Sequence, residues 1–496
     1  MEAEAEEHMQ VDHQDGDGVP LDELDVRNAS LDLESFASTY TGLGLLTRLL
    51  FVAEHAPQYT IEALRLAHAA VLKTSSVSLY HKIMELWKNY ATGRQDSDQP
   101  PGMDTQWLAE TKKNAQLLEE RLDNDLKHFK ANNIKESIRR CYDELGDFHM
   151  LSGDLGMALK CYSRARDYCG TSMSLAEMCL NIIKISIYQH QYVHALSYVL
   201  RANQALSGMP QGGGETKTAA AVVALLTKVE CSAGLASLAQ GAYRVAAGHF
   251  LAAALDEFAY TDVLSPNNVA MYGGLCAMAT YSREELQTQV LSSASFKLFL
   301  ELEPQVRDML HKFQSSKYSQ CLQTLDKMRP NLLLDCYLSR HVHFLYAMVR
   351  KKALVQFFSP YQCVSLDKMA QVFNTDVTSL EDELTVLILD GAISGKIDSQ
   401  EKVLYASDVD QKASTFADVK LLGDTYHRSV QALVLRMAVK KHHVTVSASA
   451  AGKHHPFDVG AGTDGSVEGM MDQGLVQVVQ GPGVVGFPGR RRMHFE

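Results

Sequence analysis

The sequence predicts an all-α protein: an array of tetratricopeptide-like helical repeats, then a winged-helix module, then one further long helix. Three observations lead to this fold class. Apolar residues recur at helical spacing from about residue 31 to 340, without long alternation of Val, Ile and Thr. A small residue four positions before a large one recurs within that stretch. Beyond residue 341 the pattern becomes helix, strand, helix, helix and hairpin.

The chain is long enough for several cores, and its two ends differ from its body. It has 496 residues, of which 46% are hydrophobic, and a net charge of -12. Residues 1–25 hold ten acidic residues and no Lys or Arg, which leaves 49 acidic against 47 basic residues elsewhere. We therefore expect residues 1–30 to form a disordered acidic tail. The alternative is a docking segment for a basic partner. Residues 444–496, which contain ten glycines, are predicted to be a second disordered tail.

Residues 31–240 are predicted to form the helical-repeat arm. The clearest repeat places Ala158 four residues before Tyr162, and it recurs as Ala246 before Phe250. Small residues let two antiparallel helices approach, and the large residue fills the groove behind them. The period is irregular, so the repeats are degenerate. Such arrays usually bind other proteins along their faces, and the alternative is that this one is only a spacer.

Cysteine usage and the N-terminal sequence predict a protein of a reducing compartment. None of the nine cysteines forms a CxxC pair, which argues against a zinc ribbon, a thioredoxin-type motif and a disulfide framework. The N-terminus is acidic, whereas a signal peptide is first basic and then apolar. No uninterrupted run of about 18 apolar residues occurs, so we expect no membrane span and a soluble, intracellular protein.

Residues 341–410 carry the winged-helix pattern. A first helix is predicted to end at Ser359 and Pro360, and a short extended segment follows it. Ser365 is expected to cap the next helix. Thr378 is expected to open a capping box on the helix after that.

A hairpin completes the module. Its strands are predicted at Ala392–Ile397 and Val403–Ala406, joined by a polar turn. The outer edge of these strands can be paired by a strand of a partner protein. We expect Leu404 to belong to this protein-binding edge.

Winged helices often bind DNA through their last helix, but here that region is acidic. Its acidic side chains are Asp376, Glu381, Asp382, Glu383 and Asp390. No Lys or Arg lies between Lys368 and Lys396. Because phosphate contacts supply most of the affinity for nucleic acid, such a surface repels it. We therefore expect protein partners and no direct binding of nucleic acid.

Residues 411–443 are predicted to form the last helix. Apolar residues at alternating spacings of three and four form a heptad seam over three heptads. The six side chains of the seam are Phe416, Val419, Tyr426, Val430, Leu433 and Met437. Further apolar residues lie off the seam, so the helix needs neighbours on two sides. Burial among helices of other subunits is the favoured expectation, and cover by its own winged helix is the alternative.

No catalytic motif is complete in the sequence. His341 and His343 form an HxH pair like that of the zinc proteases that cleave ubiquitin-like modifiers. The Asp that this motif needs eleven residues later is replaced by Leu354. The P-loop, GxSxG and Rossmann glycine motifs do not occur either. We therefore expect a protein that is not an enzyme and that holds no metal and no cofactor.

A set of segments is specific enough to indicate a family: residues 103–114, 158–169, 296–308, 331–335, 356–361, 370–390 and 404–410. Together they resemble the subunit 1 family of the constitutive photomorphogenesis 9 signalosome. The resemblance spans roughly residues 31–443. It implies a PCI domain at residues 241–410, in which a helical bundle precedes the winged helix. PCI domains pair edge to edge through their winged helices.

The resemblance also implies a function. It indicates a non-catalytic scaffold subunit of the complex that removes the ubiquitin-like modifier from cullins and so regulates cullin-RING ubiquitin ligases. The catalytic zinc of that complex belongs to a different subunit. The implied partners are other signalosome subunits, through the winged-helix edge and the last helix, and cullin-RING ligases through the complex. We expect the protein in the nucleus and the cytoplasm. The alternative is the paralogous regulatory subunit of the proteasome lid.

Overall fold

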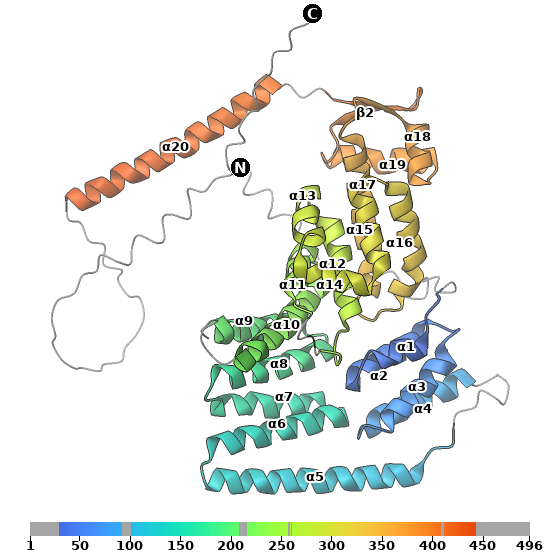
Figure 1. Cartoon of the computed structure of the whole chain (residues 1–496), viewed down its shortest axis with the longest axis vertical. Coiled ribbons are helices and arrows are strands. Elements are labelled where there is room, and N and C mark those ends of the chain that lie inside the picture. Colours follow the sequence, from blue (N-terminus) through green and yellow to red (C-terminus); the bar gives the residue numbers. More distant parts are fainter. Residues whose placement is uncertain are drawn as a thin grey trace, which may run out of the picture. The chain divides into compact units, whose positions relative to one another are not determined.

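The computed structural model describes residues 29–91, 101–207, 216–255, 258, 260–407 and 411–442. In these ranges the chain is helical apart from three short strands (Figure 1). It falls into two compact units, one through Asp408 and one from Val409. Most of the predicted acidic tail and all of the predicted Gly-rich tail lie outside the described residues.

The first unit begins with four helices that share a core. The carboxylate of Asp32 starts the first of them by accepting hydrogen bonds from the backbone N–H groups of Glu34 and Ser35. Trp107 and Leu108 from the next helix pack partly against this core. The four helices are α1 (Leu33–Ser38), α2 (Gly42–His55), α3 (Thr60–Val71) and α4 (Val77–Ala91).

A long helix then leads into the arm. α5 (Thr105–Ala131) begins after Asp104, whose carboxylate accepts the backbone N–H of Trp107. Its buried side chains, Leu122 and Leu126, lie in its second half and belong to the large core of the following helices. The first half of α5 therefore contacts the N-terminal helices and the second half contacts the arm.

Antiparallel helices of the arm pack in pairs (Figure 1). In two pairs a glycine of the first helix faces a ring of the second. A Cβ on Gly146 would stand 2.5 Å from Tyr162, and one on Gly234 would stand 2.8 Å from Phe250. The predicted repeats thus mark the places where two helices approach closely. The arm consists of α6 (Lys135–Ser152), α7 (Leu155–Ala165), η3 (Arg166–Tyr168), α8 (Ser172–Tyr188), α9 (Tyr192–Ser207), α10 (Thr216–Ala239) and α11 (Tyr243–Ala252).

Within the described ranges, α10 is the one helix whose length and composition would let it cross a membrane. Its segment Ala220–Ala239 has a mean hydropathy of 1.5, and 61% of it is buried inside the structure. It packs against α8, α9 and α11. Thr227, Lys228 and Glu230 interrupt its apolar run, so the sequence did not indicate a membrane span here. Its apolar residues serve the core of the arm.

A bundle of helices follows, with α12 (Pro266–Thr280) at its centre. Ser265 caps this helix and Pro266 occupies its first position, where the missing N–H is no loss. α12 contacts α11, α14, α15 and α17. The rest of the bundle is α13 (Arg283–Glu285), the π-helical turn η4 (Leu286–Leu291), α14 (Ala294–Leu302), α15 (Pro304–Gln314), α16 (Tyr318–Leu333) and α17 (Ser339–Phe358).

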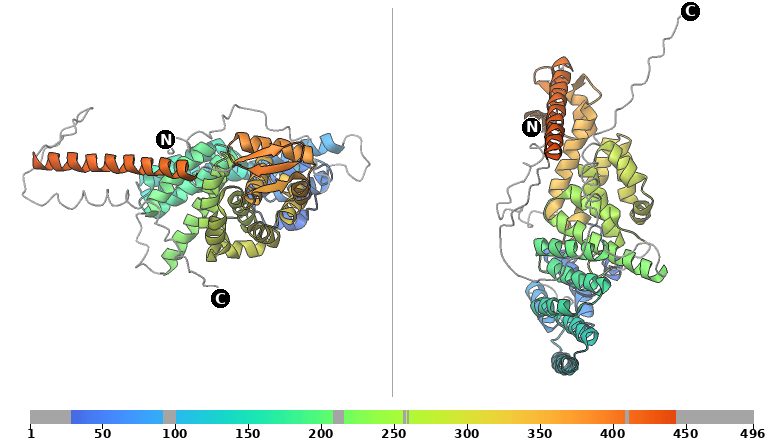
Figure 2. Two further views of the ribbon diagram at one scale, coloured as in Figure 1. Left: turned by 90° about the horizontal axis from the view of Figure 1, so that it is seen from above. Right: turned by 90° about the vertical axis from the view of Figure 1, so that its left-hand side faces the viewer.

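The winged-helix module closes the first unit. Its elements are β1 (Cys363–Ser365), α18 (Leu366–Phe373), α19 (Val377–Leu389), β2 (Gly395–Asp398) and β3 (Val403–Ala406). All pairings in the sheet are antiparallel, and the strand order is β1-β3-β2. The left view of Figure 2 shows the three strands side by side. Leu366, Met369, Leu380 and Leu384 are fully buried beneath them in the common core.

Three local expectations for this module are wrong. α19 begins two residues earlier than its expected capping box predicts, after Asp376, and the hydroxyl of Thr378 donates to the carboxylate of Asp376 instead. Ser365 precedes α18, but its side chain makes no capping hydrogen bond. The first hairpin strand begins at Gly395 and not at Ala392, because the backbone N–H of Ala392 donates to a carbonyl of α19 and closes that helix.

The second unit contains one described element, the helix α20 (Gln411–Lys441). Every side chain that the structure describes between residues 412 and 442 is exposed. The predicted fold class is confirmed: a helical-repeat array leads into a helical bundle with a small sheet, and a long helix follows. The residue boundaries 31–240, 241–410 and 411–443 stay predictions.

Candidate functional site

The sheet of the winged-helix module has two outer edges, and Leu404 lies on neither. β3 is the central strand, and Leu404 pairs with Val364 of β1 on one side and with Ile397 of β2 on the other. Its side chain is 0% exposed. The expectation that Leu404 contacts a partner at the edge is therefore wrong, because β1 occupies that position in the sheet. No further strand among the described residues pairs with β1 or β2.

The outer edge of β1 offers free backbone groups. The N–H of Ala406 on β3 donates to the carbonyl of Gln362 at 2.8 Å. Because hydrogen-bonded residues alternate in an antiparallel ladder, Val364 directs its backbone groups at β3. Cys363 and Ser365 direct theirs outward. They are placed to pair with a strand from another protein.

The outer edge of β2 is free in the same way. The N–H of Ser407 donates to the carbonyl of Ser394 at 3.0 Å. By the same alternation, Gly395 and Ile397 direct their backbone groups away from β3. That either edge binds a partner stays a prediction.

The acidic residues of α19 are largely paired within the chain. Arg350 donates to Glu383 at 2.9 Å, Lys402 to Glu381 at 2.6 Å and Lys351 to Asp390 at 2.7 Å. These three basic groups are thus engaged by carboxylates and are not arranged to contact phosphates. The exposed surface of α19 is therefore neutral to acidic in charge. The side chains of Val386 and Leu389 are exposed on the same helix.

α20 exposes its predicted seam along its whole length. The exposed fraction is 73% for Phe416 and 58% for Leu433, and the other four side chains of the seam are exposed as well. These four are Val419, Tyr426, Val430 and Met437. Burying an apolar side chain of this size contributes about 1.5–3 kcal/mol. The seam therefore suits association with other helices, and that it does so stays a prediction.

The HxH pair lies on α17 without further metal ligands. Nδ1 of His341 lies 3.2 Å from the hydroxyl of Tyr243, and His343 is exposed. Leu354 is buried in the core. Across the ranges that the structure describes, no group of three or more His, Cys, Asp and Glu side chains could hold a metal ion.

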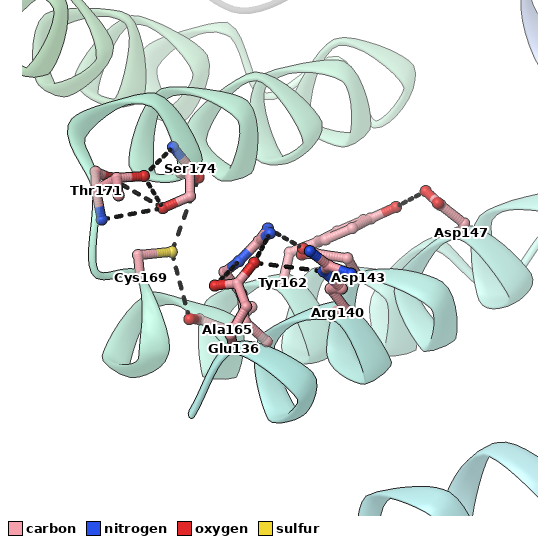
Figure 3. Close-up of polar contacts among 10 residues, drawn as sticks. Glu136, Arg140, Asp143, Asp147, Tyr162, Ala165, Cys169, Thr171 and Ser174 are labelled. Carbon is pink, nitrogen blue, oxygen red and sulfur yellow. Dashed lines mark hydrogen bonds and ion pairs between the residues drawn. The ribbon is translucent and has the colours of Figure 1, made fainter. Parts of the chain in front are cut away.

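Figure 3 shows polar contacts that join the helices of the arm. The hydroxyl of Tyr162 donates to Asp147 at 2.5 Å, which joins α7 to α6. Thr171 and Ser174 form a capping box that starts α8. Burial, against the pull of the nearby Arg139, raises the pKa of Asp143 to about 6. These contacts join α7 to α6 and start α8.

Sequence patterns did not indicate the buried ion pair between Arg48 of α2 and Asp335, which lies between α16 and α17. The two side chains meet at 3.1 Å, although 287 positions separate them in the chain. No motif or periodicity connects such distant positions, and only an arginine on an otherwise apolar helix face could have drawn attention to it.

Similarity to known proteins shows the family to which this chain belongs. Residues 104–289 match the family model of the 26S proteasome subunit RPN7, and residues 320–408 match that of the PCI domain. The chain is 42% identical to COP9 signalosome complex subunit 1b of Drosophila melanogaster, over 90% of this chain and 92% of that one. It is 38% identical to COP9 signalosome complex subunit 1 of Arabidopsis thaliana, over 83% and 90% of the two chains. The chain belongs to the COP9 signalosome subunit 1 family.

Membership of the COP9 signalosome subunit 1 family confirms the resemblance found in the sequence. The proteasome lid is more distant: identity to the 26S proteasome regulatory subunit RPN7 of Saccharomyces cerevisiae is 21%, over 56% of this chain and 63% of that one. In this signalosome subunit, the PCI match covers the end of the helical bundle and the winged-helix module. It therefore includes both free sheet edges.

Proposed function

We propose that the chain is a scaffold subunit of the complex that removes the ubiquitin-like modifier from cullins and so regulates cullin-RING ubiquitin ligases. Its similarity to COP9 signalosome complex subunit 1b along 90% of its length carries this proposal. A scaffold has to offer several separate binding surfaces. The helical arm, the two sheet edges and α20 are the four surfaces that we propose for this role, and their presence on one chain supports the proposal.

Two of these surfaces are proposed to bind neighbouring signalosome subunits. A strand of one neighbour adds to the outer edge of β1 or β2, where main-chain hydrogen bonds supply the affinity. Helices of other subunits cover the seam of α20, which supplies apolar area. Cullin-RING ligases are reached through the assembled complex. We propose no direct contact with nucleic acid, since the basic groups beside α19 are paired with carboxylates, and no contact with a membrane.

The subunit is proposed to have no catalytic role of its own. The HxH pair of α17 lacks the acidic third ligand because residue 354 is a buried leucine. A zinc that activates water needs three protein ligands and an open position. The chain is also proposed to act in both the nucleus and the cytoplasm.

Affinity purification of the tagged full chain followed by mass spectrometry tests the assignment. We expect cullins and signalosome subunits to co-purify. The runner-up function, a regulatory subunit of the proteasome lid, predicts proteasome ATPases in their place. Fractionation of nuclei and cytoplasm in the same cells tests the location, and absence from either compartment contradicts that part of the proposal.

An activity assay tests the non-catalytic role. The purified chain alone is incubated with modified cullin, with and without added zinc, beside the complete complex as a positive control. We expect cleavage by the complex only. Zinc-dependent cleavage by the isolated chain that disappears in His343→Ala contradicts the proposal.

A further inference from the structure

Helices α1–α4 form a module whose core is separate from the rest of the first unit. In the part of the chain that the structure describes, Leu334 is the only buried member of this core contributed from beyond residue 91. The remaining helices of the unit share a second, larger core. Tyr40, just before α2, donates to Asn268 near the start of α12, and Arg48 of α2 donates to Asp335, which follows α16. Several of the contacts at that place are polar.

Arg48 of α2 is the centre of these contacts. Its side chain is 2% exposed. Nη1 donates to Oδ2 of Asp335 at 3.1 Å, and Nη2 donates to the carbonyl of Val263 at 3.1 Å. The guanidinium lies 4.4 Å from the ring centre of Tyr40 and 5.1 Å from that of Tyr337. A charge buried to this degree depends on such specific partners.

Asp335 is itself held in position from several sides. The hydroxyl of Tyr272 donates to Oδ1 at 2.6 Å. The backbone N–H groups of Tyr337 and Leu338 donate to the same oxygen, so the carboxylate also holds the turn that precedes α17. Burial, and after it the charge of Asp335, raises the pKa of Tyr272, so its hydroxyl remains a donor. The second oxygen is thereby fixed toward Arg48.

A second group of polar contacts meets at Asp262, just before α12. Thr41 donates to Oδ1 at 2.7 Å, and Lys184 of α8 donates to Oδ2 at 3.0 Å. Tyr188 of α8 donates to the backbone carbonyl at 2.9 Å. A Cβ on Gly44 would stand only 1.7 Å from that carbonyl oxygen, so α2 approaches the backbone here. The module, the arm and the bundle thus meet at one residue.

At another place the module contacts the arm directly. The hydroxyl of Tyr80 accepts the backbone N–H of Asp104 at 3.1 Å, and its ring lies 5.0 Å from that of Trp107 on α5. A Cβ on Gly153, in the turn between α6 and α7, would stand 2.9 Å from Oγ of Ser76. α1–α4 therefore bridge the arm and the bundle.

We propose that α1–α4 act as a separable brace that fixes the arm relative to the bundle α12–α17, and that the Arg48–Asp335 pair decides whether the brace is docked. Parts of a chain that have separate cores and meet through a polar interface move relative to one another by default. Loss of one partner of a buried ion pair leaves an unpaired buried charge, which is strongly unfavourable. Disruption of the pair therefore releases the module as a whole and leaves both cores folded.

The test uses the full chain with a specific protease site, flanked by Gly-Ser spacers, inserted between Gln95 and Asp96. After cleavage, the N-terminal fragment is expected to stay bound on gel filtration. In Arg48→Met it is expected to dissociate, with an affinity at least tenfold lower. Arg166→Met is the matched control, because that arginine is exposed and pairs only with its neighbour Asp167. It is expected to behave like the unsubstituted chain.

Equal retention of the fragment in the unsubstituted chain and in Arg48→Met overturns the proposal. Complete loss of the fragment from the cleaved unsubstituted chain overturns it too, since the pair would then not hold the module. Amide hydrogen exchange on the uncleaved chain separates release from unfolding. We expect α1–α4 to open while α12–α17 stay protected, and Asp335→Asn to accelerate that opening at least tenfold. Identical protection of the two regions in the unsubstituted chain means that the module is not separable.

Discussion

Gly146 of α6 faces the phenol ring of Tyr162 on α7, so closely that a Cβ on residue 146 would stand 2.5 Å from Cζ of that ring. Gly234 of α10 has the same relation to Phe250 on α11, with a closest approach of 2.8 Å. Both rings are fully buried. The distance between the two helices of each pair is therefore set by the absence of a side chain on one helix and a flat ring on the other.

Gly146→Ala and Gly234→Ala are expected to destabilise the chain by about 1–3 kcal/mol, because the added methyl group overpacks a closed core. Gly248→Ala is the matched control. It lies inside α11, and the nearest atom to its Cβ would be the hydroxyl of Tyr281 at 3.7 Å. This variant is expected to gain up to about 1 kcal/mol from helix propensity. Unfolding of the full chain in urea measures the differences, and a stabilising effect at 146 would contradict the packing argument.

Leu433→Asp in the seam of α20 is expected to leave the melting temperature of the isolated chain unchanged, because the side chain is 58% exposed there. In the complex, the same charge falls within the proposed helix bundle, where burial without a partner costs several kcal/mol. The subunit is then expected to separate from its partners on gel filtration at low concentration. Gln431→Asp, exposed and off the seam, serves as the control.

Two outcomes would contradict a bundle role for α20. If Leu433→Asp co-elutes with its partners as completely as Gln431→Asp does, the seam is not an interface. If the substitution instead lowers the melting temperature of the isolated chain, α20 packs within its own chain. The second outcome would favour cover by the winged helix, the alternative that the sequence left open.

Cys363→Pro tests the edge of β1. The backbone N–H of Cys363 points away from β3, so a proline there leaves the sheet intact and removes one donor from the outer edge. We expect loss of one neighbouring subunit from the purified complex with an unchanged melting temperature. Cys363→Ser keeps the N–H and is expected to keep that neighbour. Leu404→Pro disrupts the central strand and serves as the reference for a damaged sheet, with a lowered melting temperature. Full subunit composition with Cys363→Pro would exclude this edge.

Lys352 is expected to make the stability of the chain depend on pH in a defined direction. Its Nζ donates to the carbonyls of Met278 and Tyr281 at the end of α12 and lies 5.4 Å from the ring centre of Phe313. Burial lowers the pKa of this lysine from its ordinary 10.5 to about 8. Between pH 8 and 10.5 the unfolded chain therefore binds more protons at this position than the folded chain does. The contribution of Lys352 to stability accordingly rises with pH across that window.

The measurement compares the free energy of unfolding of the unsubstituted chain and Lys352→Met at several pH values from 7 to 10. The difference, unsubstituted minus variant, is expected to grow with pH above about 8. Lys351→Met is the control on the same helix, since Lys351 is exposed and paired with Asp390. A constant difference for Lys352→Met would show that the burial of this amine has no consequence for its protonation.

Local periodicity was sufficient to predict a helical array and its small-to-large repeat. Ala158 and Tyr162 are buried together because residues four apart share a face of one helix. The partner of that ring, Gly146, was not predicted, since it lies on a different helix and a single glycine carries no periodic signal. The start of α19 was also misplaced from the sequence. Both Asp376 and Thr378 are good capping residues, and sequence spacing alone favoured the wrong one.

The candidate interaction surfaces stay predictions, and the structure corrects the position of one residue among them. The seam of α20 follows from heptad spacing, which is a property of one helix. Which strands form the edges of the sheet depends on which strand lies at its centre. That order is set by tertiary packing and not by any local sequence pattern. β1 inserts beside β3, so Leu404 became a core residue although its strand was predicted correctly. The contact of Arg48 with Asp335 lies beyond any local pattern for the same reason.

The separation of 287 positions between Arg48 and Asp335 also sets an order of events at the ribosome. At a synthesis rate of about 5–20 residues per second, Arg48 is made on the order of tens of seconds before Asp335 exists. During that interval α1–α4 can assemble their apolar core, while the guanidinium stays in water for lack of a partner. The segment that is translated first therefore makes its last buried contact late, when residue 335 has been synthesised and packs against α2.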